Sequence, residues 1–231
     1  LLNYYGYTPI HALPTRASFA SVGSILQMLP SNFSGTILGS GLIAESTMRF
    51  ESATILGVRG AYTMDLIQAP QDTVLGDPGL LLPQISKKLP ARKYLVGLIP
   101  HYQDKGDKSI AKISKHYPAY VRVIDVQRPP IAVLHDVARC EYILSSSLHG
   151  LVVADALGIP NAWLVLSDKV FGQGFKFRDY YSAFNCSYDP ISLMGEETLE
   201  QLVQHTHVPS PQIPIIQAKL DQQFKELAYI L

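Results

Sequence analysis

Residues 141–160 read Glu-Tyr-Ile-Leu-Ser-Ser-Ser-Leu-His-Gly-Leu-Val-Val-Ala-Asp-Ala-Leu-Gly-Ile-Pro, and this stretch decides the fold class. A short apolar run ends in three serines, and a helical stretch follows that stops before Gly158 and Pro160. A strand, a polar loop and a helix in this order are typical of an α/β protein with a parallel sheet.

Similar apolar runs alternate with helical stretches along most of the chain. We predict strands at 36–38, 53–56, 73–75, 94–99, 120–125, 141–144 and 161–165. We predict helices at 61–69, 108–116, 131–140, 148–157 and 215–231. The strands are apolar without alternation, which indicates that helices cover both faces of the sheet.

The segment 82–92 mixes prolines with charges and is the best candidate for a linker. It would separate two Rossmann-like domains, an N-terminal one over 1–86 and a C-terminal one over 90–208. The first is short for such a domain, so elements could be missing upstream, and the helix of 211–231 could complete it.

Composition excludes several classes of protein. Of the 231 residues, 47% are hydrophobic and 16% charged, which excludes disorder. Lys and Arg (19) balance Asp and Glu (19), so nothing favours a nucleic-acid partner. The longest apolar stretch, 142–166, contains His149 and Asp155 and does not read as a membrane span. Two cysteines without metal spacing indicate a reducing cytoplasm and no metal site.

The serines after the strand point to an anion. They lie where open α/β sheets bind ligands and just before a helix whose N–H groups attract negative charge. Ser146 and Ser147 are therefore candidates for binding phosphate or carboxylate, although one of them could simply cap the helix.

Two histidines are placed near the same edge of the sheet. His149, in the first helical turn, is either a catalytic group or a hydrogen-bonded core residue, and Gly150 beside it would allow a ligand to approach closely. His101 follows the strand 94–99, whose carboxyl end meets the same edge, and is the second candidate.

Further motifs occur in a fixed order: Gly57-Val58-Arg59-Gly60, Gly76-Asp77-Pro78-Gly79-Leu80-Leu81 and Ser167-Asp168-Lys169. With Ser147-Leu148-His149-Gly150-Leu151 they resemble the polysaccharide pyruvyl transferase family over residues 21–182, most of all the branch that decorates bacterial exopolysaccharides. The resemblance implies two Rossmann-like domains in a GT-B-like arrangement.

The resemblance also implies a reaction. This family moves the enolpyruvyl group of phosphoenolpyruvate onto two hydroxyls of one sugar, which leaves a cyclic ketal and free phosphate. The partners would be phosphoenolpyruvate and a saccharide or lipid-linked oligosaccharide acceptor, and no separate cofactor is expected. A lipid-linked acceptor would bring this cytoplasmic protein to the inner face of the membrane.

Site residues carry over position by position. The resemblance makes His149 the acid or base, Arg59 a catalytic and donor-binding arginine, and Lys169 a further positive charge on the donor. From their places at the sheet edge, Ser146 and Ser147 are candidates for binding the donor, and His101 for contacting the sugar or the donor phosphate. From the residues alone, Arg59 could be a surface arginine, Lys169 a solvated lysine, and Asp77 either catalytic or part of an ordinary Asp-Pro-Gly turn.

The chain departs from the family pattern in two places. Ser147 stands where many members carry arginine, and Lys176 or Arg178, from the glycine-containing loop 172–180, could supply the missing charge. The family's early Asn-x-Gly-Asp motif is absent, so part of the acceptor site would be remade. Two other functions therefore stay open: a nucleotide-sugar-dependent glycosyltransferase with the same fold, and a non-catalytic glycan-binding relative.

Overall fold

The computed structural model describes residues 1–86 and 88–227, which divide into two compact units. The first unit contains residues 1–85 and 171–187 together with the described residues from Pro211 onward. The second unit contains 86–170 and 188–210. The division between residues 85 and 86 falls inside the segment 82–92. Residues 171–187 belong to the first unit, so the predicted continuous domain 90–208 is corrected.

The second unit is built on a four-stranded parallel sheet with the strand order β6-β5-β7-β8. Its strands are β5 (Tyr94–Ile99), β6 (Val121–Val123), β7 (Cys140–Ser145) and β8 (Asn161–Trp163). The chain also returns beside β8, where Asn161 and Leu164 bridge to His207 and Ile191. This pairing explains why 188–210 belongs to the second unit.

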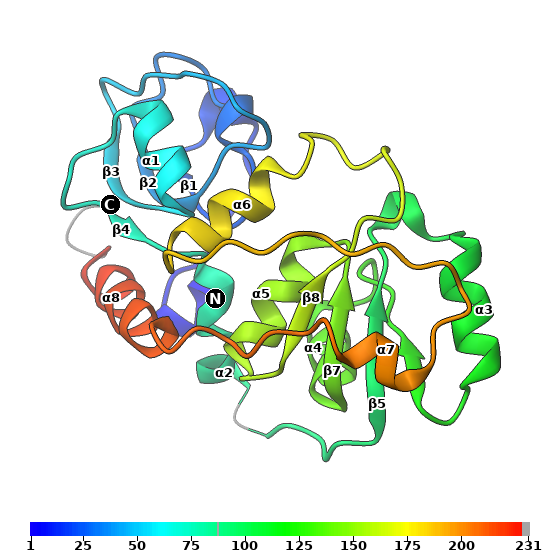
Figure 1. Cartoon of the computed structure of the whole chain (residues 1–231). Coiled ribbons are helices and arrows are strands. Elements are labelled where there is room, and N and C mark those ends of the chain that lie inside the picture. Colours follow the sequence, from blue (N-terminus) through cyan, green and yellow to red (C-terminus); the bar gives the residue numbers. More distant parts are fainter. Residues whose placement is uncertain (87, 228–231) are drawn as a thin grey trace. The chain divides into compact units, whose positions relative to one another are not determined.

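Helices cover both faces of this sheet. They are α3 (Lys108–His116), α4 (Pro130–Ala138), α5 (Leu148–Ala156) and the short α7 (Leu199–Val203). Because β6 and β7 lie on opposite sides of β5 and crossovers are right-handed, α3 covers one face while α4 and α5 cover the other (Figure 1). The side chain of Asp107 starts α3 by accepting hydrogen bonds from the N–H groups of Ser109 and Ile110.

The first unit has its own four-stranded parallel sheet, in the sequential order β1-β2-β3-β4. The strands are β1 (Phe19–Ala20), β2 (Thr36–Ser40), β3 (Thr54–Val58) and β4 (Val74–Leu75). The helices are α1 (Ala61–Ile67), α2 (Leu82–Ile85), α6 (Phe175–Ser182) and α8 (Ile213–Glu226), and 3-10 turns include η1 (Leu2–Tyr5) and η4 (Pro78–Leu81). Residues 228–231 of the predicted C-terminal helix lie outside the described residues.

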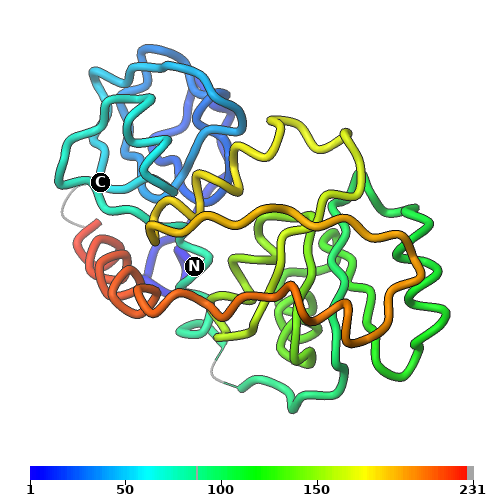
Figure 2. Tube along the Cα trace, viewed as in Figure 1, coloured from blue at the N-terminus to red at the C-terminus, as the bar shows by residue number. Residues whose placement is uncertain are grey.

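Both ends of the described chain pack together inside the first unit. The ring of Tyr5 stacks on Phe224 with 5.2 Å between centroids, and its hydroxyl donates to Asp221 at 2.6 Å. Figure 2 shows the blue N-terminal turn lying beside the red helix α8. Burial and the neighbouring Asp221 raise the pKa of Tyr5 well above its usual value. The helix α8 is thus an integral part of the first unit.

Four elements were not predicted: β1, α6, the short α7, and α2, which begins inside the predicted linker 82–92. The two-residue strand β1 was not predicted, because so short a strand leaves no periodic pattern to detect. The region around Lys176 and Arg178, predicted as a loop, is the helix α6. Its aromatic residues Phe177, Tyr180 and Tyr181 are buried, and this packing supports a helix that the mixed aromatic and charged sequence does not indicate.

Candidate functional site

The strand order of the second unit creates a topological switch point. From β5 the chain goes outward to β6 and then returns across β5 to β7 and β8. Open α/β sheets bind ligands beyond the carboxyl ends of the strands where the order reverses. Here that place lies between β5 and β7, and the residues following these two strands are His101 and the serine loop leading to His149.

His149 stands out in an otherwise buried helix. Leu148 and residues 150–155 of α5 are all buried, whereas the imidazole in the first turn is exposed. The N-cap residue Ser147 makes no side-chain capping hydrogen bond. An exposed imidazole and a serine hydroxyl thus lie together at the amino end of a nine-residue helix.

The first serine of the loop holds its shape. The hydroxyl of Ser145 donates to the carbonyl oxygen of Ser147 at 2.8 Å and accepts from the Ser147 N–H at 3.0 Å. A Cβ at position 150 would lie 2.3 Å from the same hydroxyl oxygen. Gly150 therefore leaves room for Ser145, which corrects the expectation that the close approach is that of a ligand.

The hydroxyl of Ser146 is already committed. It donates to the carboxylate of Asp104 at 3.0 Å and its oxygen accepts from the backbone N–H of His101 at 2.8 Å. A serine has one O–H to donate, so no proton is left for a phosphate or carboxylate ligand. Ser146 links two loops in this structure, and its contact with the donor stays a prediction.

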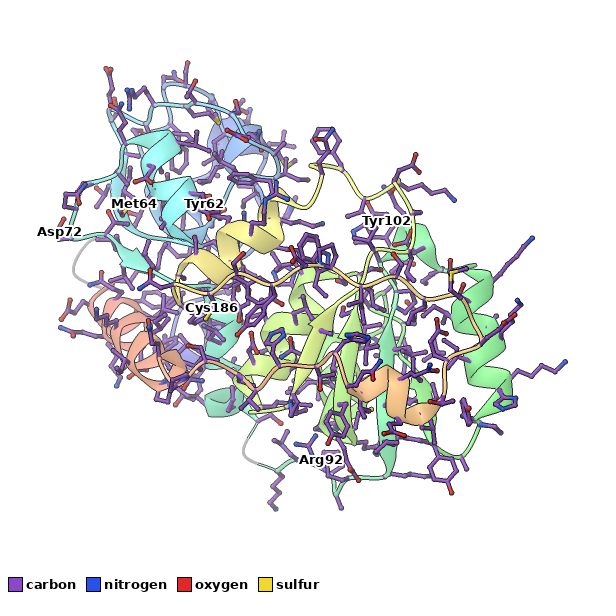
Figure 3. The ribbon with its side chains drawn as sticks, in the orientation of Figure 1. Tyr62, Met64, Asp72, Arg92, Tyr102 and Cys186 are labelled. Atoms are coloured by element: carbon purple, nitrogen blue, oxygen red, sulfur yellow. The ribbon has the colours of Figure 1, made fainter. Side chains whose placement is uncertain are left out.

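The remaining predicted residues of the second unit lie near the ends of neighbouring strands. Lys169 follows β8 and is exposed, and its backbone N–H donates to the hydroxyl of Ser167 at 3.2 Å. His101 is partly buried and begins the turn η5 (Tyr102–Asp104), with its ring 4.3 Å from that of Tyr102. Tyr102 is 51% exposed and is labelled in Figure 3. His101, His149 and Lys169 thus follow β5, β7 and β8 in turn.

Arg59 takes a different place from the one predicted. Its side chain is fully buried in the first unit, where Nε donates to Asp179 at 2.9 Å and a second nitrogen lies 2.8 Å from the same carboxylate oxygen. The guanidinium also donates to the hydroxyl of Ser24 and the carbonyl oxygen of Leu42, each at 2.5 Å. These internal partners occupy the guanidinium, and the catalytic and donor-binding role of Arg59 stays a prediction.

The other candidates of the first unit are placed individually. Lys176 is 9% exposed, with its Nζ 5.4 Å from the Phe177 ring centroid. Arg178 is exposed and donates to the carbonyl oxygen of Gln173 at 2.9 Å. Asp77 is fully buried and caps η4 by accepting from the Gly79 N–H at 2.8 Å, which is turn chemistry.

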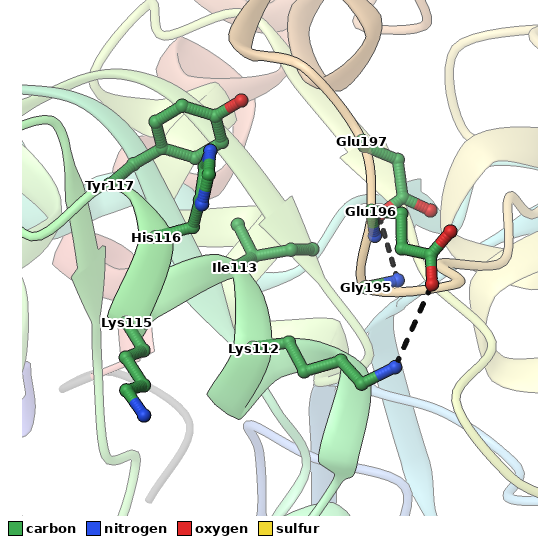
Figure 4. A pocket seen from close by; sticks show the side chains of 8 residues that line it. All are labelled: Lys112, Ile113, Lys115, His116, Tyr117, Gly195, Glu196 and Glu197. Atoms are coloured by element: carbon green, nitrogen blue, oxygen red, sulfur yellow. Dashed lines mark hydrogen bonds and ion pairs between the residues drawn. The ribbon is translucent and has the colours of Figure 1, made fainter.

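A pocket of about 530 Å³ lies on another part of the second unit (Figure 4). Its described lining consists of Lys112, Ile113, Lys115, His116, Tyr117, Gly195, Glu196 and Glu197, and includes none of the predicted site residues. Burial alone would raise the pKa of Glu197, but backbone N–H groups from Met194 to Glu197 donate to its carboxylate and lower the pKa overall. The carboxylate is therefore held by its own loop.

Within 1–86 and 88–227, no group of three or more His, Cys, Asp or Glu side chains is arranged to hold a metal ion. Across the same residues, every helix is too short or too polar to cross a membrane.

Comparison with known proteins identifies the class to which this α/β chain belongs. The profile of the polysaccharide pyruvyl transferase family matches residues 24–168, more than half of the chain. The chain therefore belongs to the polysaccharide pyruvyl transferase family. The matched range contains β2 through β8 as well as His149.

Two curated proteins are similar to this chain over about three quarters of its length. An uncharacterized protein of Acanthamoeba polyphaga mimivirus, L143, is 36% identical over 181 residues, which are 74% of this chain and 61% of that protein. The succinoglycan biosynthesis protein ExoV of Rhizobium meliloti (strain 1021) is 23% identical over 194 residues, 79% of this chain and 58% of ExoV. The chain thus spans about 60% of the length of these curated relatives.

Among solved structures, a likeness is found to the wall teichoic acid polymerase TagF. One structure of its H444N variant has a TM-score of 0.45 at 11% identity and covers 92% of this chain and 70% of that one. A second has a TM-score of 0.40, also at 11% identity, and covers 91% of this chain and 73% of that one.

Proposed function

We propose that this chain carries a ketal pyruvyltransferase activity, which moves the enolpyruvyl group of phosphoenolpyruvate onto two hydroxyls of a sugar. The acceptor would be part of an exopolysaccharide or its lipid-linked precursor, and the protein would act in the cytoplasm with its two units in a GT-B-like arrangement. Membership of the family supports the reaction class, and the name of ExoV, a succinoglycan biosynthesis protein, supports a saccharide acceptor.

The observation that carries the proposal is the exposed imidazole of His149 at the switch point of the second unit. Protonation of C3 of the enol ether turns C2 into an oxocarbenium-like centre, to which both sugar oxygens bond in turn while the C2–O bond to phosphate breaks. One hydroxyl proton is balanced by the proton gained at C3, and the other leaves with phosphate. His149 is the group that moves a proton in this scheme.

The donor's charges need partners as well. The Ser147 hydroxyl and the α5 amino end would bind one anionic group, and the exposed Lys169 would neutralise another. His101 would contact the donor from the end of β5. Lys176 and Arg178 remain candidates for donor contacts from the first unit, whereas Arg59 would act by holding that unit together.

The test is turnover of phosphoenolpyruvate with a panel of galactosides, mannosides and glucosides. We expect free phosphate together with an acceptor whose mass has increased by one pyruvate less one water. His149→Gln should lower kcat by about 10²- to 10⁴-fold, the usual contribution of a general acid or base. His116→Gln, which changes an exposed histidine at the end of α3, is the matched control and should keep full activity.

Three results would contradict the proposal. Normal turnover by His149→Gln would remove the proton-transfer role. Nucleotide release from an activated sugar, with no phosphate release from phosphoenolpyruvate, would favour a glycosyltransferase. Sugar binding by calorimetry with no turnover of any donor would favour a glycan-binding protein.

A further inference from the structure

One buried carboxylate joins the loops at the carboxyl ends of three strands. Asp104 ends the turn η5 that follows β5, and it is 5% exposed. Its Oδ2 accepts from the Ser146 hydroxyl at 3.0 Å, in the loop after β7, and its Oδ1 accepts from the Ser167 hydroxyl at 2.5 Å, after β8. All of these residues belong to the second unit.

Each serine is in turn tied to a residue of the proposed site. The oxygen of Ser146 accepts from the His101 N–H at 2.8 Å, and Ser146 lies three positions before His149. The oxygen of Ser167 accepts from the Lys169 N–H at 3.2 Å. One carboxylate is therefore one or two hydrogen bonds away from the backbone of His101 and Lys169 and from the loop that leads into α5.

Because a carboxylate accepts hydrogen bonds, it determines which atom donates and which accepts throughout this arrangement. An ionised carboxylate only accepts, so it orients both hydroxyl protons toward itself and leaves both serine oxygens free to accept from backbone N–H groups. Removing this buried acceptor leaves the buried hydroxyl of Ser146 and the partly buried hydroxyl of Ser167 to find other partners, and the loops would shift to satisfy them.

We propose that Asp104 is a positioning residue that holds the β5, β7 and β8 loops in one fixed arrangement, so that His101, His149 and Lys169 act on the same donor molecule. This inference rests on the proposed function for its kinetic readout. Ser146 positions the histidine side of the site, and Ser167 positions the loop of Lys169.

Kinetics separate positioning from general destabilisation. Asp104→Ala should lower kcat/KM for phosphoenolpyruvate by about 10²-fold, the loss expected from a misplacement of roughly 1 Å. Ser167→Ala should raise the donor KM with kcat within about twofold of wild type, and Ser146→Ala should mainly lower kcat. In the double variant Asp104→Ala/Ser167→Ala the KM effects should not add, since both act through one contact.

Asp107→Asn is the matched control, because Asp107 is a nearby carboxylate that caps α3 by accepting from the N–H groups of Ser109 and Ile110. It should leave kcat and KM within about twofold of wild type even where it lowers stability. If Asp104→Ala does not fold, the isosteric Asp104→Asn replaces it, with the same direction of change. Unchanged kcat and KM in the folded Asp104 variant, or fully additive effects in the double variant, would overturn the proposal.

Hydrogen exchange tests the same inference without any substrate. Asp104→Ala should speed exchange in peptides covering 100–104 and 164–170 relative to Asp107→Asn, whereas unchanged protection there would overturn the positioning role. If wild type turns over no donor while these peptides do exchange faster, the proposed function fails and the positioning role of Asp104 stands.

Discussion

Replacing Asp179 by asparagine should destabilise the first unit strongly, because it leaves the buried Arg59 without its counter-charge. Both side chains of the pair are fully buried. The carboxylate also accepts from the N–H and the hydroxyl of Thr63, each at 2.7 Å. The pair thus ties α6 to the start of α1 and to the end of β3, which lie more than a hundred residues away in the sequence.

The magnitude follows from the burial of the pair. Breaking a buried ion pair by neutralising one partner costs about 3–5 kcal/mol, a large part of the roughly 5–15 kcal/mol that stabilises a typical domain. Asparagine keeps the shape but has one acceptor oxygen where aspartate has two, so the loss reports the uncompensated guanidinium together with one lost acceptor. The double variant Arg59→Met/Asp179→Leu should recover much of the stability, because apolar residues of similar volume need no counter-charge.

Hydrogen exchange in peptides covering α1 and α6 is the most direct assay. At tenfold for each 1.4 kcal/mol, the expected loss of about 3–5 kcal/mol speeds global-opening exchange by about 10²- to 4 × 10³-fold. Urea unfolding followed by far-UV circular dichroism should show the matching fall in midpoint.

The control is Arg178→Ala, which removes the exposed neighbour of Asp179 and should change stability by less than about 0.5 kcal/mol. A loss below about 1 kcal/mol in Asp179→Asn would refute the reasoning. The stability of the first unit would then not depend on the Arg59–Asp179 pair.

Three further perturbations test other parts of the structure. Burial lowers the pKa of His207 from 6.5 to about 4. Between these two pH values the imidazole is protonated in the unfolded state and neutral in the folded state. The free energy of unfolding should therefore fall by about 1–2 kcal/mol between pH 6.5 and 4, less than for a fully buried ring because solvent screens the partly exposed imidazole. Urea titrations of His207→Gln should show no such fall. Burial raises the pKa of Cys140 to about 12, so a thiol reagent should label the half-buried Cys186 (Figure 3) first, and equal rates would contradict this. Gly150→Ala should cost about 1–3 kcal/mol in thermal unfolding from its clash with the loop-closing hydroxyl, whereas Gly106→Ala, with open space around it, should be tolerated.

Local patterns were sufficient for the regular elements. The predicted strand 94–99 and the predicted helix 108–116 coincide with β5 and α3, because continuous apolar residues and a strong helical repeat need no distant partner to be recognised. The helix α6 could not be recognised without its distant partners, since the packing of its aromatic residues and the ion pair between Asp179 and Arg59 hold it in the first unit.

The candidate site likewise has one part that local sequence patterns predicted and another part that they did not. Chain order predicted that His101 and the serine loop would meet at one edge of a parallel sheet, since a polar loop after a buried strand needs no other information. Asp104 was missed, because an aspartate in a short polar turn gives no signal of its later partners.

By itself, then, the sequence determined the α/β class, most of the strands and helices, and the placement of His149 at a helix start beyond a strand, because these depend on neighbours in the chain. Only the tertiary structure decided that Arg59 is an internal ion-pair partner and that Asp104 joins three loops. The physical reason is that charged side chains form ion pairs and hydrogen bonds with the groups that folding brings within about 3 Å. The separation of two residues in the sequence does not predict that distance.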